Sequence, residues 1–168
     1  EFIFVTTFDD DDLGDFYDDD EIESQEFFNS WNVLIVDDEE DVHSATKIAL
    51  NQFEFEGRKL NFTSAYSGRQ AFDLLQQNNE FALAFIDVVM ETEHAGLKLV
   101  KAIRKEILNT KCRIILRTGQ PGFAPEDEVI REYDINDYRN KADLTAAKIK
   151  STCYTALRSY RDLLNLER

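Results

Sequence analysis

From Trp31 onward, apolar segments of strand length alternate with segments whose apolar residues recur at helical spacing. The strand-like segments are NVLIVDD (32–38), LNFTSA (60–65), FALAFID (81–87), CRIILRT (112–118) and INDYRN (135–140). Between them, GLKLVKAIRKEI shows the helical spacing clearly, and SGRQAFDLLQQNN opens with a capping box from Ser67 to Gln70. Five strand and helix pairs in alternation predict a parallel sheet sandwiched by helices.

The apolar content of the strands predicts their order in the sheet. The first, third and fourth strands are continuously apolar, as expected of central strands covered on both faces. The second and fifth are shorter or alternate between apolar and polar residues, which is typical of edges. The pattern favours an α/β, flavodoxin-like (βα)5 doubly wound parallel sheet with strand order 2-1-3-4-5. Ligands of such sheets bind at the carboxyl ends of strands one and three, where the order reverses.

Charge is distributed unevenly along the 168 residues. The formal net charge is −15; 17 of the 34 acidic residues precede Lys47, the first basic residue, and the other 17 accompany all 19 basic residues. Residues 1–30, which include FDDDDLGDFYDDDEIESQEFF, have the acidic and aromatic composition of disordered interaction segments. We expect either a solubilising tail or a segment whose FIFVT stretch adds to a sheet edge. No basic patch indicates nucleic acid.

The remaining composition indicates a cytoplasmic protein. No apolar run approaches the ~20 residues that span a bilayer, and no signal peptide is recognisable. Cys112 and Cys153 lie in strand-like and helix-like patterns without metal-ligand spacing, so we interpret both as reduced core residues. His43 and His94 have no partners at ligand spacing, and we expect both at the surface or in loops.

One carboxylate, Asp87, interrupts the apolar run FALAFIDVVM, where an ionised group is costly unless something compensates it. Taken alone, Asp87 could begin a solvated turn or cap a helix. However, Asp37 and Asp38 end the adjacent strand one, so we expect three carboxylates to meet. Oxygen ligands of this kind suit Mg²⁺. Asp37 or Asp38 could singly cap the next helix, but capping does not account for both.

Thr118 ends strand four and Lys141 follows strand five, so both are expected to face the same crevice. Metal acceptors, a carboxylate free to attack phosphorus, a hydroxyl donor and an ammonium are the equipment for phosphoryl transfer onto a carboxylate. Alone, a threonine there is usually a β-former and a lysine is usually solvated. Their occurrence together with Asp87 favours the functional interpretation.

In order and spacing, VLIVDDEED, FID, ILRTG and YRNK resemble the motifs of receiver domains of two-component response regulators, over about residues 31–160. The resemblance implies that Asp87 accepts a phosphoryl group from a histidine kinase or a phosphotransfer protein. Thr118 and Lys141 would be its catalytic partners. Such a domain is a regulatory phosphoacceptor that catalyses only its own phosphoryl transfer, and is not a metabolic enzyme.

The resemblance also implies a cofactor and a switch. Mg²⁺ would be bound directly by Asp38, Asp87 and the backbone carbonyl of Val89, with Asp37 acting largely through water. Thr118 would move to hydrogen-bond the phosphate, and Tyr138 would turn inward behind it.

VVMETEHAGLKLV and RTGQPGFAPE further resemble a subgroup that precedes an uncharacterised domain and HD-GYP-type cyclic-dinucleotide phosphodiesterases. We therefore expect a segment at 1–30, a receiver domain at 31–160, and at 161–168 the start of a linker helix to an output domain outside this chain. The long final helix could also pair with a second subunit in a homodimer.

Two departures from the family pattern keep alternatives open. Ala142 stands where the family usually has proline, which predicts a trans Lys141–Ala142 peptide, and Glu91 stands where proline is common. One alternative is a receiver-like module that docks proteins without taking phosphate. Another is an aspartyl-phosphate phosphatase, which would want an Asp-x-Asp pair at strand one. A flavin or nucleotide site is disfavoured because no glycine-rich loop follows that strand.

Overall fold

The computed structural model describes residues 29–119 and 126–168, with the backbone alone over 126–129. The acidic N-terminal segment and its FIFVT stretch lie outside these ranges. The strands are β1 (Trp31–Val36), β2 (Glu54–Phe55), β3 (Arg58–Ala65), β4 (Leu83–Asp87), β5 (Arg113–Thr118) and β6 (Asp137–Asn140). The α-helices are α2 (Glu40–Ala49), α3 (Gly68–Gln77), α4 (Ala95–Lys105), α5 (Glu126–Tyr133) and α6 (Ala146–Leu166), with a 3₁₀ turn at Lys141–Asp143.

The strands form one sheet in the order β2-β3-β1-β4-β5-β6. Its five parallel strands, β3-β1-β4-β5-β6, are the predicted order 2-1-3-4-5, so the fold prediction is confirmed. The short strand β2 pairs antiparallel with β3 and was not predicted. Two residues are too few to show a period of two. The turn itself uses positive φ angles at Glu56 (52°) and Gly57 (72°), as tight hairpins require.

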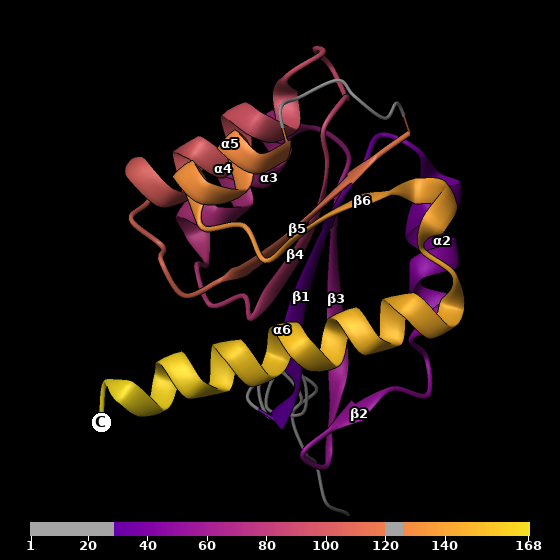
Figure 1. Ribbon diagram of the computed structural model, residues 1–168, viewed down its shortest axis with the longest axis vertical. Coiled ribbons are helices and arrows are strands. Elements are labelled where there is room, and N and C mark those ends of the chain that lie inside the picture. The colour runs from indigo at the N-terminus through magenta and orange to yellow at the C-terminus, as the bar shows by residue number, and fades with distance from the viewer. Residues whose placement is uncertain (1–28, 120–125) are drawn as a thin grey trace, which may run out of the picture.

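Helices cover both faces of the sheet, as Figure 1 shows: α2 and α6 pack on one side and α3, α4 and α5 on the other. Each side has its own apolar cluster, and the side chains of the central strands are buried. The α4 side is built around Leu34, Ile86 and Leu116, and the α6 side around Ile35, Phe85 and Ile115. This alternation explains why the central strands read as unbroken apolar runs.

Local sequence signals set the helix starts. Ser67 Oγ accepts a hydrogen bond from Gln70 N–H (3.0 Å), which confirms the Ser67 cap, whereas Gln70 Oε1 accepts its bond from Tyr66 N–H (2.8 Å) and not from Ser67 N–H as in a capping box. Thr145 caps α6 through the Lys148 N–H. Within the ranges described above, no helix is both long and apolar enough to cross a bilayer.

Both cysteines lie in the core, as predicted. Cys112 and Cys153 are fully buried free thiols, and burial raises the pKa of each to about 12. Because the thiolate is the reactive species, alkylation near pH 8 should be slower by about a thousandfold than for a thiol of pKa 9. We expect iodoacetamide to leave the native protein unmodified while adding two groups after unfolding in urea. Rapid native labelling, measured by intact mass, would contradict this burial.

Candidate functional site

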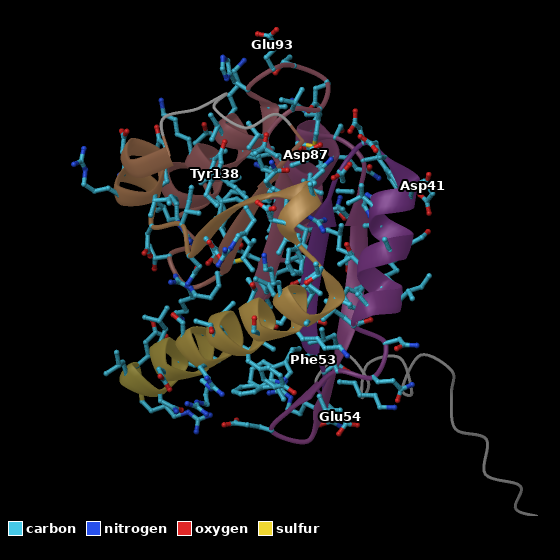
Figure 2. The ribbon with its side chains drawn as sticks, turned by 45° about the vertical axis from the view of Figure 1, so that its right-hand side comes forward. Asp41, Phe53, Glu54, Asp87, Glu93 and Tyr138 are labelled. Atoms are coloured by element: carbon cyan, nitrogen blue, oxygen red, sulfur yellow. The ribbon has the colours of Figure 1, made fainter. Side chains whose placement is uncertain are left out.

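Four of the predicted site residues lie at one edge of the sheet, where the parallel strands end. Asp87 and Thr118 are the last residues of β4 and β5, Asp37 follows β1, and Lys141 follows β6. Figure 2 shows Asp87 towards this end of the molecule and Phe53 at the other. Parallel pairing of adjacent strands brings these side chains to a common edge, as the sequence predicted.

The ammonium group of Lys141 joins two of the aspartates. Its Nζ lies 3.0 Å from Asp37 Oδ2, 3.0 Å from Asp87 Oδ2 and 3.8 Å from Glu39 Oε1. The Asp37 and Asp87 side chains are only 0% and 5% exposed, so water screens these attractions weakly. Lys141 therefore holds together two carboxylates that would otherwise repel each other.

Asp37, Asp38 and Glu39 form a group of carboxylates whose oxygen atoms lie within 4.8 Å of one another. Asp37 is buried, whereas Asp38 and Glu39 are exposed. Asp87 lies outside this group of three and reaches it through Lys141. Sequence reasoning missed Glu39, although a third consecutive acid after the predicted pair was a signal for it.

Capping does not explain the acidic pair. The N-cap residue of α2 is Glu39, which makes no side-chain capping hydrogen bond. Asp37 Oδ1 accepts a hydrogen bond from Glu39 N–H at 3.0 Å. Its other oxygen, Oδ2, is buried and is paired only with the Lys141 ammonium, at 3.0 Å, within the part of the chain that the structure describes. A buried carboxylate oxygen left in this state fits the ligand set of a cation.

The environment of Asp87 disfavours its charge. Burial raises the pKa of Asp87, and the nearby Asp37 carboxylate raises it further. The hydrogen bond and charge of Lys141 and a hydrogen bond from Val89 N–H (3.4 Å) oppose this rise only in part. Val89 is thus placed with its backbone beside the Asp87 carboxylate.

Asp87→Asn is therefore expected to stabilise the fold in metal-free buffer at neutral pH. A carboxyl whose folded pKa is raised destabilises the protein once ionised, and this penalty disappears as pH falls through the folded pKa. Asparagine removes the charge, while Lys141 keeps Asp37 and Glu39 as partners. We expect thermal unfolding to shift upward by about 2–4 °C, the effect of about 1 kcal/mol in a domain of this size. If Asp87→Asn unfolded at a lower temperature than the wild type in buffer containing chelator, the raised pKa assigned to Asp87 would be contradicted.

Thr118 and Tyr138 lie on neighbouring strands. Thr118 is 1% exposed at the end of β5. On β6, Tyr138 pairs in register with Leu116, and its half-buried ring packs against the apolar cluster together with Ile130 and Tyr133. Its hydroxyl oxygen is buried. The ring thus connects the end of the sheet to the side covered by α5.

The expectation that His43 lies at the surface is wrong. His43 is completely buried in α2, with Nε2 2.8 Å from the Asp37 carbonyl oxygen and Nδ1 2.9 Å from Ser64 Oγ. Its ring packs against Tyr66, with centroids 4.5 Å apart. The helical spacing of His43 and Thr46 in α2, continued by Leu50 just after the helix, was the signal. His94, in contrast, is exposed just before α4, as expected.

Hydrogen bonds attach the loop after Asp87 to the starts of α3 and α4. The Glu91 carboxylate accepts hydrogen bonds from Gly68 N–H (2.8 Å) and Arg69 N–H (3.4 Å) at the start of α3. At the start of α4, Gly96 N–H donates to the Val88 carbonyl oxygen at 3.0 Å. Glu91, which departs from the family pattern, therefore holds the loop against α3. The Lys141–Ala142 peptide is trans, as predicted.

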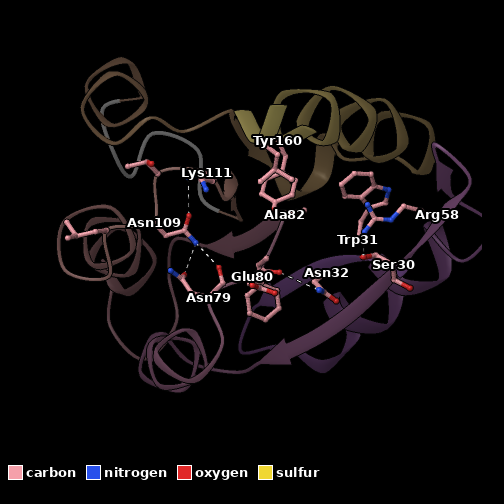
Figure 3. Close-up of a pocket in the computed structure, with 14 residues that line it drawn as sticks. Ser30, Trp31, Asn32, Arg58, Asn79, Glu80, Ala82, Asn109, Lys111 and Tyr160 are labelled. Carbon is pink, nitrogen blue, oxygen red and sulfur yellow. Dashed lines mark hydrogen bonds between the residues drawn. The ribbon is translucent and has the colours of Figure 1, made fainter. Parts of the chain in front are cut away.

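A separate pocket lies away from these residues, at the amino ends of the strands. It has a volume of about 360 Å³ and is bordered by Trp31, Asn32, Asn109 and Tyr160, and Figure 3 shows its lining. Its polar groups already pair with one another: Asn109 Nδ2 donates to Asn79, and Asn32 Nδ2 to the Glu80 carbonyl oxygen. The carboxylate edge is therefore the better candidate for chemistry.

Comparison with known proteins agrees with this geometry. The pattern of the response regulator receiver domain matches residues 33–146. The chain is 50% identical to the 3'3'-cGAMP-specific phosphodiesterase 2 of Vibrio cholerae over 137 residues, which are 82% of this chain. The chain spans 26% of the length of that relative.

Solved structures share the fold. The signal receiver domain of an HD domain-containing protein from Pseudomonas fluorescens superposes with a TM-score of 0.67 at 21% identity, over 82% of this chain and 93% of that one. A response regulator receiver domain protein from Clostridium thermocellum superposes with a TM-score of 0.66 at 19% identity, over 79% of this chain and 98% of that one. At these identities the likeness establishes the architecture alone.

Proposed function

The chain belongs to the response regulator receiver domain family, and from this premise we propose that Asp87 accepts a phosphoryl group from a histidine kinase or a phosphotransfer protein. The observation that carries the proposal is the Lys141 ammonium, held 3.0 Å from both Asp37 and Asp87 at the carboxyl edge of the sheet. It places a cation where negative charge would develop on phosphoryl oxygens.

In the proposed reaction, an Asp87 carboxylate oxygen attacks phosphorus. A bond forms between that oxygen and phosphorus as the bond to the donor breaks, and the donor leaves with the electron pair. Lys141 would stay near Asp87 and neutralise charge on the transferred group. The buried Thr118 hydroxyl would donate a hydrogen bond to a phosphoryl oxygen. Gly119 carries no side chain, which leaves room beside it.

The residues present fit a divalent cation. Asp37, Glu39 and Asp87 surround one ammonium and Asp38 lies beside Asp37 and Glu39, an excess of negative charge that oxygen-binding Mg²⁺ would offset. We propose Asp38, Asp87 and the Val89 carbonyl as direct ligands, with Asp37 acting through water. When bound, Mg²⁺ supplies charge neutralisation at the phosphoryl oxygens.

Phosphorylation would act as a switch on a linked output domain. The added charge would draw in Thr118, and Tyr138 would turn further behind it, changing the face formed by α5, β6 and α6. Since the relative in Vibrio cholerae is a phosphodiesterase of which this chain spans a quarter, we propose a cyclic-dinucleotide phosphodiesterase as the output. The chain itself would then be the regulatory part of a cytoplasmic protein.

Phosphorylation from a small donor tests the proposal. The chain is incubated with acetyl phosphate and Mg²⁺, and its intact mass is measured with and without excess EDTA. We expect one added phosphoryl group in the presence of the metal and none in chelator. No mass increase under any metal condition would reject phosphoacceptor function in favour of a receiver-like docking module.

A further inference from the structure

A second pocket lies on the other side of Lys141, between α2 and the start of α6. It has a volume of about 230 Å³. Its walls are mainly apolar and consist of Val42, Ala45, Ala49, Leu144 and Ile149. Lys141 also lines it, although the Lys141 ammonium is held by Asp37 and Asp87. We call this space the α2–α6 pocket.

Arg117, on β5, lines the α2–α6 pocket and is only 4% exposed. Its Nη1 donates to Thr46 Oγ1 at 2.8 Å, and its guanidinium carbon lies 4.9 Å from the centre of the Phe85 ring. Nε and Nη2 are buried and donate to no residue within the described ranges. Two donor nitrogens of a permanently charged group thus lack acceptors.

Such a group is unusual because burying a cation without acceptors is costly, and arginine does not escape the cost by losing its proton. The other two buried guanidinium groups, of Arg104 and Arg113, have several hydrogen-bond acceptors each. Arg104 donates to three backbone carbonyls, of Tyr133, Asn109 and Asp134. Arg113 donates to two carbonyls and to the Asp134 carboxylate. Arg117 alone among these three is left incompletely paired.

Nearby carboxylates that make no hydrogen bond to Arg117 compensate its charge only in part. Asp87 is its register partner on β4, and Asp37 is also near enough to favour the charged form. Burial still lowers the pKa of Arg117 overall. Neither carboxylate accepts a hydrogen bond from it. What Arg117 lacks is an acceptor for Nε and Nη2, which are themselves closed to water, and the accessible space that this residue lines is the α2–α6 pocket.

We propose that the α2–α6 pocket binds a small organic monoanion, with a carboxylate head at Arg117 and a compact branched aliphatic body between α2 and α6. A carboxylate matches the planar fork of donors on a guanidinium. The apolar walls suit an aliphatic body, and the volume equals about eight water-sized groups at ~30 Å³ each. The amino terminus of α6 adds a favourable dipole, whereas Asp41 at the border disfavours multiply charged anions.

Calorimetric titration of the whole chain at constant ionic strength tests this site, with isovalerate as the probe. We expect saturable binding of isovalerate to the wild type. Isovaleramide, its neutral counterpart, should bind on the order of tenfold more weakly or not at all. Inorganic phosphate should not compete. No saturable binding of isovalerate, equal binding of the amide, or preferential binding of phosphate would each overturn the proposal.

Two variants test separately the contribution of the Arg117 charge and that of the pocket volume to binding. Arg117→Met removes a buried, incompletely paired charge, so the variant should fold and melt no lower than the wild type while losing isovalerate binding. Ala45→Leu should fill the pocket and abolish binding with Arg117 intact. Ser44→Leu, one residue away on α2 and outside the pocket lining, is the matched control and should bind normally. Binding that survives in Arg117→Met, or an equal loss in Ser44→Leu, would refute the site.

Discussion

Asp87→Asn is expected to take up no detectable phosphoryl group from acetyl phosphate under conditions that fully label the wild type. The amide nitrogen and oxygen of asparagine cannot replace the carboxylate as nucleophile, although the side chain keeps its size and its place beside Lys141. The measurement is intact mass after incubation with the donor and Mg²⁺, supported by thermal unfolding to show that the variant is folded.

Glu93→Gln is the matched control for this experiment. Glu93 is another carboxylate at the same end of the molecule, but it lies exposed at the tip of the loop after Asp87 (Figure 2). We expect its loss to leave labelling unchanged. If Asp87→Asn were labelled as fully as the wild type, the acceptor would be another residue and the proposed mechanism would be wrong.

Gly96→Ala is expected to destabilise the protein by about 3 kcal/mol or more, a fall of roughly 6–12 °C in the unfolding midpoint. A Cβ atom at Gly96 would lie 2.0 Å from the Asp87 carbonyl oxygen and 2.8 Å from the Asp87 carbonyl carbon and Val88 Cα. All three are backbone atoms and cannot rotate away. The variant should also phosphorylate poorly, because relief of the clash would displace Asp87.

The direction of this effect separates packing from helix propensity. Gly96 lies in the first turn of α4, where propensity alone would make alanine the more stable residue by up to about 1 kcal/mol. Gly119→Ala provides the comparison, since among the described residues a Cβ there meets Lys141 Cδ alone, at 4.0 Å. We expect Gly119→Ala to melt close to the wild type. A Gly96→Ala protein as stable as Gly119→Ala would show that α4 is not fixed against β4.

Much of the fold was predictable because the relevant physics is local along the chain. Unbroken apolar runs at β1, β4 and β5 report burial on both faces, and the carboxylates that end two of them stand out against that background. The order of the parallel strands follows from which strands are apolar. The hairpin β2 escaped prediction because two residues carry no period and its turn depends on φ angles.

Parts of the candidate site were not predictable in the same way. Glu39 enters the site because Lys141, 102 positions away in sequence, arrives beside it. His43 looked polar and therefore exposed, but the fold gives it two polar neighbours, Ser64 and the Asp37 carbonyl. Such compensation is invisible until distant segments are brought together, because a buried polar group is tolerated only through its partners.

The sequence by itself determined the alternation of strands and helices, the order of the parallel strands and the edge at which Asp37, Asp87, Thr118 and Lys141 gather. These features depend on hydrophobic periodicity and on the direction of parallel strands, which each segment carries on its own. Only the tertiary structure decided that one ammonium bridges Asp37 and Asp87, that Gly96 lies against the Asp87 backbone, and that two nitrogens of Arg117 lack acceptors among the described residues. Those facts depend on distances of a few ångströms between residues far apart in the chain, and electrostatics and packing change steeply over such distances.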